Sequence, residues 1–230
     1  MYQFSTGSTG PPKCIARSHR NLIFELDSFF ETLNLGHSDR FVGVAPFSHV
    51  NGLMRSMMAS IRAGAALFTV PRFERKRVAE LIESERITIF IAVPFMFGML
   101  AKSRFSPSPD FSSLRLCVSA SAPMPEKANM EFHQKFGIYV RQLYGSTETG
   151  TISVNLSDSV DDSLLSVGTP IRGVEVEVFN DEGTPAATGD LGEFAVKSPA
   201  AITAYKGAAE ANRNDFRDSY IFTGDLGRRD

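Results

Sequence analysis

The first stretch with a chemical pattern runs from Phe4 to Lys13, almost at the start of the chain. Glycine lets a backbone approach a ligand closely and adopt positive φ, so successive N–H groups can converge on one anion. Hydroxyl groups add donors, and a lysine ammonium supplies a point charge suited to phosphate. The residues of these kinds are Ser5, Thr6, Gly7, Ser8, Thr9, Gly10 and Lys13. Their pattern predicts a loop that cradles phosphate groups.

The end of this loop separates it from two alternatives. A Walker A loop closes with Gly-Lys-Ser/Thr, whereas Pro12-Lys13-Cys14 stands here. A flexible Ser/Gly linker is the plainer alternative, but a linker has no reason to end in Pro-Pro-Lys. The composition therefore favours a phosphate-binding loop of another kind.

The phosphate loop follows a predicted strand at Tyr2-Gln3-Phe4, and three further polar clusters follow predicted strands, which places four loops at one edge of one sheet. In an open parallel sheet, ligands bind beyond the carboxyl ends of the strands, so loops at these ends can share one site. Each cluster by itself is equally typical of an ordinary turn. The clusters are Pro46–Gly52 after the 41–45 strand, Ser119–Pro123 after the 114–118 strand, and Tyr144–Glu148 after the 138–143 strand.

The contents of these clusters suit a nucleotide. Small residues at Ser121, Ala122 and Pro123 leave room for a flat group, and the Tyr144 ring can stack on a base. The Glu148 carboxylate offers an oxygen ligand for Mg²⁺ that bridges phosphates.

Two more residues are candidates for binding. Asp225, in Thr223-Gly224-Asp225 after an aromatic strand at 220–222, can accept hydrogen bonds from ribose hydroxyls. For His49 a binding role and a structural role are equally open.

The elements that must position these residues alternate between strand and helix up to about residue 150. Such alternation predicts parallel βαβ units with helices on both faces of the sheet. Helices are expected at 51–62 and, with Pro125 as its first residue, at 125–136. The fold class is therefore α/β, a mostly parallel sheet with flanking helices, followed by a smaller β-rich subdomain. The predicted domains are residues 1–150 and 151–230.

Composition limits the partners. The 230 residues carry a formal net charge of −2, so no basic field argues for nucleic acid. The two cysteines lie far apart in sequence and favour a reducing compartment, so we expect a cytoplasmic protein. Neither a transmembrane segment nor a signal peptide is recognisable. The abrupt start inside a strand suggests that upstream sequence is missing.

Taken together, five motifs resemble those of the adenylate-forming superfamily, which includes acyl-CoA synthetases, luciferases and the adenylation domains of peptide synthetases. They follow the family's order and cover essentially the whole chain. The motifs are Ser5–Lys13 (phosphate loop), Pro46–Gly52 (aromatic/His motif), Ser119–Met124 (adenine pocket), Tyr144–Glu148 (Tyr-Gly-x-Thr-Glu core) and Thr223–Asp225 (ribose motif).

The resemblance implies a role for each candidate. Tyr144 would stack on adenine, Thr147 would contact the α-phosphate, Glu148 would bind Mg²⁺ with help from Ser8, and Asp225 would bind the ribose. His49 would lie between the acyl and thiol channels. The catalytic residues implied are His49, Thr147, Glu148 and Lys13; the remaining nucleotide contacts come from the phosphate loop, Ser121–Pro123, Gly145 and Ser146.

The implied reaction activates a carboxylic acid with ATP and Mg²⁺ and passes the acyl group to CoA or to a phosphopantetheine carrier protein. The motif around His49 lacks an acidic residue for a substrate ammonium, which favours a fatty or aryl acid. Three alternatives stay open: a nucleotide-binding fragment without catalysis, an adenylation domain of a peptide or polyketide synthetase, and a scaffold that keeps only the fold.

The resemblance also marks two departures. Family members continue past the ribose Asp through a hinge Arg motif into a small domain that bears a catalytic Lys, whereas this chain ends at Asp230. Cys14 stands where the family usually has Gly. We therefore expect an incomplete catalyst.

Overall fold

The computed structural model describes residues 1–5, 12–157 and 166–230. By their contacts these residues form two compact units. Unit 1 comprises residues 1–25, 146–152 and 170–230, and unit 2 comprises residues 26–145 and 153–169. The predicted division near residue 150 stays a prediction, because the contact units are discontinuous in sequence.

The largest sheet has seven strands and lies mostly in unit 2. Its first five strands in spatial order pair in parallel, as the alternation of strands and helices predicted. The order is β4 (Ala66–Thr69), β3 (Arg40–Gly43), β5 (Ile89–Ala92), β6 (Leu116–Ser119), β7 (Val140–Ser146), β8 (Gly150–Val154) and β9 (Thr169–Pro170).

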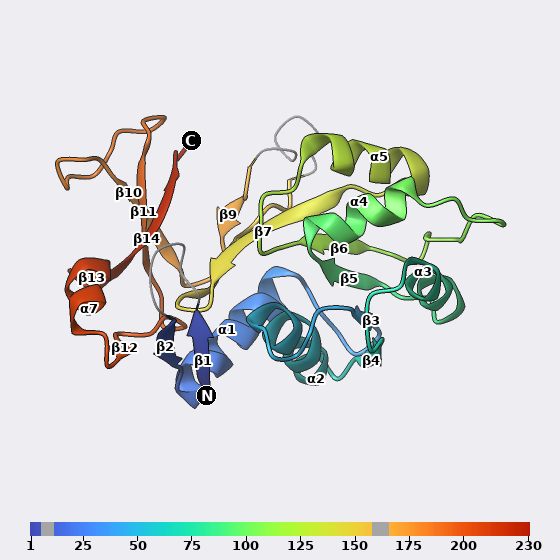
Figure 1. Cartoon of the computed structure of the whole chain (residues 1–230), viewed down its shortest axis with the longest axis horizontal. Coiled ribbons are helices and arrows are strands. Elements are labelled where there is room, and N and C mark those ends of the chain that lie inside the picture. Colours follow the sequence, from blue (N-terminus) through green and yellow to red (C-terminus); the bar gives the residue numbers. More distant parts are fainter. Residues whose placement is uncertain (6–11, 158–165) are drawn as a thin grey trace. The chain divides into compact units, whose positions relative to one another are not determined.

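Helices cover this sheet, and Figure 1 shows α4 and α5 together over β5, β6 and β7. The helices of the described chain are α1 (His19–Thr32), η1 (Asn51–Met58), α2 (Ala59–Ala63), α3 (Arg75–Ser84), α4 (Pro94–Lys102), α5 (Glu126–Phe136) and α7 (Ala209–Asp215).

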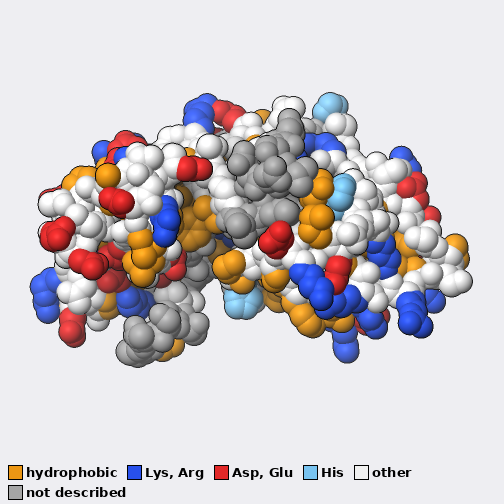
Figure 2. All heavy atoms as spheres, turned by 90° about the horizontal axis from the view of Figure 1, so that it is seen from above, with side chains coloured by type: hydrophobic (Ala, Val, Ile, Leu, Met, Phe, Trp, Pro, Cys, Tyr) orange, Lys and Arg blue, Asp and Glu red, His pale blue; other side chains and the backbone are white. Residues whose placement is uncertain are grey.

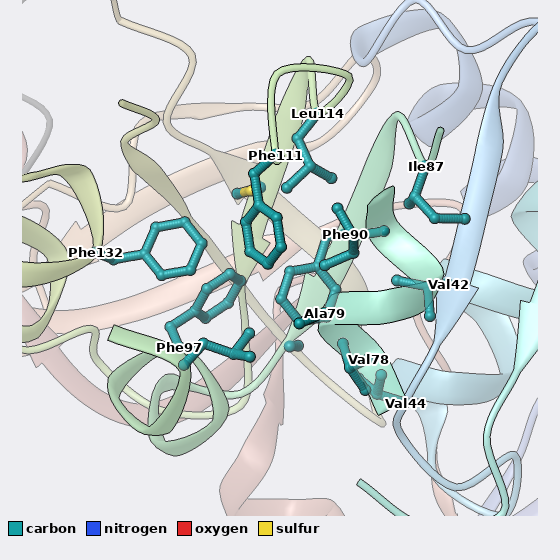
Figure 3. Packing of buried hydrophobic residues seen from close by; sticks show 14 of the residues in the cluster. Val42, Val44, Val78, Ala79, Ile87, Phe90, Phe97, Phe111, Leu114 and Phe132 are labelled. Carbon is teal, nitrogen blue, oxygen red and sulfur yellow. The ribbon is translucent and has the colours of Figure 1, made fainter. Parts of the chain in front are cut away.

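The core of unit 2 lies between the sheet and α3, α4 and α5. Figure 3 shows Phe90 of β5 beside Phe97 of α4, with ring centroids 4.9 Å apart. Phe97 in turn meets Phe132 of α5 edge to face at 5.2 Å. The neighbours of Phe90 in the strand, Ile89 and Ile91, are equally buried although they point to the other face. Both faces of the sheet are therefore covered, which is typical of parallel sheets.

The amino ends of the central strands are tied together by Asp39. Its carboxylate accepts hydrogen bonds from Arg115 Nη2 at 2.7 Å and from Arg115 Nε at 2.8 Å. It also accepts from Thr88 Oγ1 at 2.7 Å and from the N–H of Gly36 at 2.9 Å. Burial alone would raise the pKa of Asp39, but these hydrogen bonds and the Arg115 charge outweigh it and lower the pKa.

Unit 1 is built on two antiparallel sheets. The strands of the first, in spatial order, are β1 (Tyr2–Ser5), β2 (Lys13–Ala16) and β12 (Tyr205–Lys206). Those of the second are β10 (Glu175–Phe179), β11 (Gly192–Lys197), β14 (Tyr220–Gly227) and β13 (Phe216–Arg217). This unit supplies the smaller β-rich part that the sequence predicted.

Three predicted boundaries differ from the structure. The helix expected at 51–62 begins as the π-helix η1 and continues as α2. Pro125 caps α5 in an extended conformation, with ψ 128°, instead of being its first helical residue. Tyr144 lies within β7 and not after it, because that strand continues to Ser146.

Lys/Arg and Asp/Glu side chains are interspersed over the face drawn in Figure 2. In the described part of the chain, no helix combines the length and the apolar character that a membrane span requires.

Candidate functional site

The candidate residues divide between the two units. Unit 2 carries the residues that follow β3 and β6, together with Tyr144 and Gly145 of β7. Unit 1 carries the ends of the phosphate loop, Ser146–Glu148 and Asp225. Residues Thr6, Gly7, Ser8, Thr9 and Gly10 lie outside the described residues, so their predicted roles stay predictions.

In unit 2, His49 is exposed in a turn beyond the carboxyl end of β3. Its N–H donates to the carbonyl of Pro46 at 3.1 Å, and its own carbonyl accepts from Leu53 at 2.9 Å. A Cβ at Gly52 would lie only 2.4 Å from the Pro46 carbonyl oxygen, so glycine is what lets η1 begin this close to the strand. The turn therefore presents the His49 side chain to solvent at the edge where ligands bind in such sheets.

The predicted adenine-pocket residues lie beyond the carboxyl end of β6. Ser121, Ala122 and Pro123 are all exposed, and Ser121 has φ +75°, a conformation that costs a non-glycine residue roughly 1–3 kcal/mol. The loop is fixed to β7 because the N–H of Met124 donates to Gln142 Oε1 at 2.9 Å. Backbone strain in an anchored, exposed loop is typical of ligand-binding positions.

Tyr144 and Gly145 lie in β7 and are partly exposed. Since β3, β5, β6 and β7 run parallel, their carboxyl ends meet at one edge of the sheet. Unit 2 thus brings the His49 turn, the Ser121–Pro123 loop and the Tyr144 strand end to the same edge. The phosphate loop was expected at this edge too, but the strand before it, β1, pairs with β2 in a separate antiparallel sheet.

In unit 1, the turn after β7 is held by hydrogen bonds within itself. The hydroxyls of Ser146 and Thr149 lie 2.9 Å apart, and the N–H of Thr149 donates to Ser146 Oγ at 3.2 Å. Between them, Thr147 and Glu148 remain partly exposed. The carbonyl of Glu148 accepts from the N–H of Ile202 at 2.9 Å, which fixes its main chain.

A buried ion pair, Arg17–Glu25, holds the residues that directly follow this turn. Arg17 Nη2 lies 2.6 Å from Glu25 Oε2, and both side chains are almost fully buried. Glu25 Oε1 accepts from the N–H of Thr151 at 3.0 Å and from its hydroxyl at 3.2 Å. Any side chain at Gly150, which has φ +74°, would meet the Glu25 carboxyl at 2.8 Å. The start of α1 therefore fixes the chain just after Glu148.

The ends of the phosphate loop lie side by side, because Ser5 of β1 and Lys13 of β2 are register partners. Ser5 Oγ is buried and has no hydrogen-bond partner among the described residues. Lys13 Nζ lies 2.7 Å from Asp215 Oδ2 and 4.6 Å from the centre of the Tyr205 ring. Burial, reinforced by the carboxylates of Glu148 and Asp215, raises the pKa of Tyr205, so its hydroxyl remains a donor at neutral pH.

Asp225 is exposed, and the motif Thr223–Asp225 interrupts β14 where the sequence analysis expected it to follow a strand. In the pairing with β11, Glu193 faces Leu226 whereas Ala195 faces Phe222, so the three residues form an irregularity in the ladder. Thr223 Oγ1 donates to the Phe194 carbonyl at 3.0 Å. Bulges of this kind change the direction of side chains and are common next to functional sites.

Tyr205 and Asp215 are the residues that sequence analysis missed. Each lies about 190–200 positions from Lys13 in the chain, and the Lys13–Asp215 bond joins residues 202 apart. Neither belongs to any of the five motifs, so no local pattern could have identified them.

Mg²⁺ prefers oxygen ligands, and Glu148 offers a carboxylate. Within the described residues, no three His, Cys, Asp or Glu side chains gather into a metal cage. Mg²⁺ in nucleotide sites is usually held by one or two carboxylates and the substrate phosphates. A partly exposed carboxylate such as Glu148 fits that arrangement.

The fold defines a class, namely α/β proteins with polar loops at the carboxyl edge of a mostly parallel sheet. Residues 1–206 match the family described as AMP-binding enzyme. The chain therefore belongs to the AMP-binding enzyme family.

Curated relatives include the indoleacetate–CoA ligase of Aromatoleum aromaticum, 30% identical over 99% of this chain and 44% of that protein. The long-chain-fatty-acid–CoA ligase of Bacillus subtilis is 27% identical over 100% of this chain and 42% of its own length. The chain thus spans less than half the length of these relatives.

Solved structures show the same coverage. ATP-bound MatB from Rhodopseudomonas palustris superposes with a TM-score of 0.90 at 28% identity, over 99% of this chain and 45% of that one. O-succinylbenzoate CoA synthetase from Bacillus subtilis, in complex with ATP and magnesium, gives a TM-score of 0.89 at 27% identity, over 99% and 47%.

Proposed function

We propose that the chain is the nucleotide-binding part of an acid–thiol ligase, which activates a carboxylic acid with ATP and transfers it to a thiol. The observation that carries the proposal is the Tyr144–Glu148 stretch, which combines a ring, a hydroxyl and a carboxylate where β7 ends. The names of the relatives, which are CoA ligases, support the same reaction class.

The first step joins two anions. An oxygen of the substrate carboxylate forms a bond to the α-phosphorus of ATP, and the bond from that phosphorus to the pyrophosphate oxygen breaks. The carboxylate is already ionised near neutral pH, so no general base is needed. The chain must instead hold both anions in line and offset their charge.

Named residues divide that task. Lys13 and the phosphate loop would bind the phosphates, Thr147 would donate to the α-phosphate, and Tyr144 and Asp225 would hold the base and the ribose. Glu148 would hold Mg²⁺, which when bound offsets phosphate charge. Since Lys13 is paired with Asp215 at 2.7 Å, its ammonium is already fixed near the end of the loop.

In the second step the thiol sulfur forms a bond to the acyl carbon, AMP leaves with the electron pair of the broken bond, and the thiol proton passes to solvent. We propose CoA as the thiol because the curated relatives are named as CoA ligases. His49, exposed beyond β3, would lie beside the path of the thiol. A phosphopantetheine carrier protein is the competing acceptor.

For the acid we propose a fatty or aryl carboxylate. The turn at Ser48–Asn51 contains no acidic residue that could pair with a substrate ammonium. Relatives named for indoleacetate, 4-coumarate and long-chain fatty acids support this class.

The test is calorimetry of ATP and of adenosine, each with and without Mg²⁺. We expect Mg²⁺ to strengthen ATP binding in the parent chain. Glu148→Gln keeps the shape of the side chain but removes its charge, so it should abolish this dependence and leave adenosine binding nearly unchanged. Glu175→Gln is the matched control, because Glu175 is an exposed carboxylate of β10 paired with Lys197.

Two outcomes would contradict the proposal. If Mg²⁺ strengthens ATP binding equally in both variants, the metal ligand lies elsewhere. If the parent binds neither ATP nor adenosine, the chain is a scaffold that retains only the fold.

A further inference from the structure

Lys13, the lysine that ends the phosphate loop, is paired with an acidic residue 202 positions further along the chain. Its Nζ donates a hydrogen bond to Asp215 Oδ2 at 2.7 Å. The same ammonium lies 4.6 Å from the centre of the Tyr205 ring. The Lys13 side chain is 28% exposed and that of Asp215 is 25% exposed. Because the pair is partly buried, salt and solvent screen its charges less than they screen a fully exposed pair.

The main chain on both sides of the pair is fixed by hydrogen bonds. Lys13 begins β2, and β2 pairs with Tyr205 and Lys206 of β12. Asp215 ends α7, and Asn212 of the same helix ties α7 to β12. The N–H of Tyr205 donates to Asn212 Oδ1 at 2.7 Å, and Asn212 Nδ2 donates to the Tyr205 carbonyl at 3.0 Å. The fold of unit 1 therefore brings the carboxylate to the ammonium.

The local structure does not favour a negative charge at Asp215. The residue lies at the C-terminal end of α7, where the partial negative charge of a helix disfavours a carboxylate. A role in stability alone is the alternative, but a single partly exposed ion pair contributes little to stability. The position of this carboxylate on the lysine of the phosphate loop therefore calls for another reason.

The charge of Asp215 acts on any phosphate that Lys13 binds. An ammonium–phosphate hydrogen bond is about 2.8 Å long, so a phosphate oxygen on Lys13 Nζ lies within about 5.5 Å of Asp215 Oδ2 while the ion pair persists. At that distance a phosphate and a carboxylate repel each other. The phosphate must share the ammonium with Asp215 or displace it, and both cost affinity. This cost rises with the negative charge of the nucleotide, which Mg²⁺ lowers.

We propose that Asp215 is a specificity-determining residue of the ATP site, which disfavours metal-free ATP and so selects the Mg²⁺ complex. The inference rests on the proposed function, in which Lys13 binds phosphate and Glu148 holds Mg²⁺. Glu148 would favour the complex by attracting the metal, whereas Asp215 would act by repelling the free nucleotide. The two roles therefore predict opposite effects on ATP affinity when each charge is removed.

The test is calorimetry of Asp215→Asn with three ligands: ATP in excess EDTA, ATP with Mg²⁺, and adenosine. The variant removes the charge and keeps an oxygen that can accept from Lys13. Metal-free ATP should bind about three- to tenfold more tightly than in the parent, as expected from one unit charge about 5.5 Å away in a partly exposed site. Affinities for Mg²⁺–ATP and for adenosine should each change by less than about twofold. A gain in affinity cannot arise from damage to the fold.

Two controls accompany this measurement. Glu175→Gln removes the carboxylate of another ion pair of unit 1, Lys197–Glu175 at 3.1 Å, and should leave the affinity for metal-free ATP unchanged. Salt provides the second control, because ions screen charge repulsion. The difference between Asp215→Asn and the parent should shrink as the ionic strength rises from about 0.1 M to about 1 M.

Two results would overturn the inference and leave the proposed function intact. The first is an affinity for metal-free ATP that is unchanged or lower in Asp215→Asn. The second is a gain of equal size for metal-free and Mg²⁺-bound ATP. Lys13→Met separates these results from a failure of the proposed function. If Lys13→Met binds ATP as tightly as the parent does, Lys13 does not bind phosphate, and both the inference and the proposed role of Lys13 are wrong.

Discussion

At the scale of the residue, the ring of Tyr144 is the group proposed to bind the base. It is partly exposed in β7, directly before Gly145. Stacking of a base on an aromatic ring is worth about 1–3 kcal/mol. Tyr144→Ala should therefore weaken both ATP and adenosine binding by about 5- to 150-fold, measured by calorimetry.

The comparison of two ligands distinguishes this role from that of Glu148, whose loss should affect ATP alone. Tyr144→Phe, which keeps a ring, should bind both ligands nearly as the parent does. Equal affinities in the alanine variant and the parent would show that the base lies elsewhere.

Individual residues also show the limit of sequence analysis. Lys13 could be predicted because its neighbours in the chain form a chemical pattern. Tyr205 and Asp215 could not, because they meet Lys13 only after unit 1 folds, and Asp215 lies 202 residues from Lys13 in the chain. What decides their positions is tertiary packing in the cluster around Ile15, which no local pattern records.

At the scale of the element, the two ends of the parallel strands serve different purposes. The carboxyl ends of β3, β6 and β7 carry the candidate loops, whereas the amino ends of β3, β5 and β6 are tied together through Asp39, Thr88 and Arg115. The strands themselves were predictable because fully buried β-branched and aromatic runs are typical of parallel sheets. The end of β7 could not be predicted. Gly145 suggests a turn in the sequence, but in the structure the strand continues through it to Ser146.

The hydrogen bonds that Asp39 accepts at the amino ends of β3, β5 and β6 lead to a prediction about stability. Asp39→Asn removes the charge that Arg115 and Thr88 hold, and should lower the free energy of unfolding by about 1–3 kcal/mol. The lower part of this range is expected, because the Arg115 side chain is 40% exposed and can regain water. Urea unfolding at pH 7 measures the change.

Controls for this prediction come from charge and from pH. Asp27→Asn breaks the exposed pair with Arg62, at 2.7 Å, and should cost less than about 1 kcal/mol.

Since the folded pKa of Asp39 lies below its unfolded value, the stabilisation is complete above that unfolded value, about 3.9, and is lost as pH falls through the folded pKa. An Asp39→Asn difference that persisted undiminished below this range would show that the charge is not its cause.

At the scale of the whole molecule, the decisive fact is that the chain corresponds to less than half of each curated relative's length. The chain aligns almost completely with its relatives, yet matches only 42–45% of the length of the first curated ones. The candidate residues for base, ribose, phosphate and metal all fall inside the matched part. Whatever the relatives contribute from the rest of their length has no counterpart in these 230 residues.

We therefore predict that the 230-residue chain binds Mg²⁺–ATP but exchanges pyrophosphate into ATP slowly or not at all. Holding the carboxylate in line with the α-phosphate can contribute roughly 7–11 kcal/mol to lowering the barrier, provided that the geometry is fixed and water is excluded. Closing segments commonly provide this exclusion, and the candidate residues named above act mainly on the nucleotide. Exchange should be measured with a panel of fatty and aryl acids, on this chain and on one extended by its natural flanking sequence. Turnover by the short chain at an ordinary enzymatic rate, about 1–10³ s⁻¹, would show that these residues suffice for adenylation.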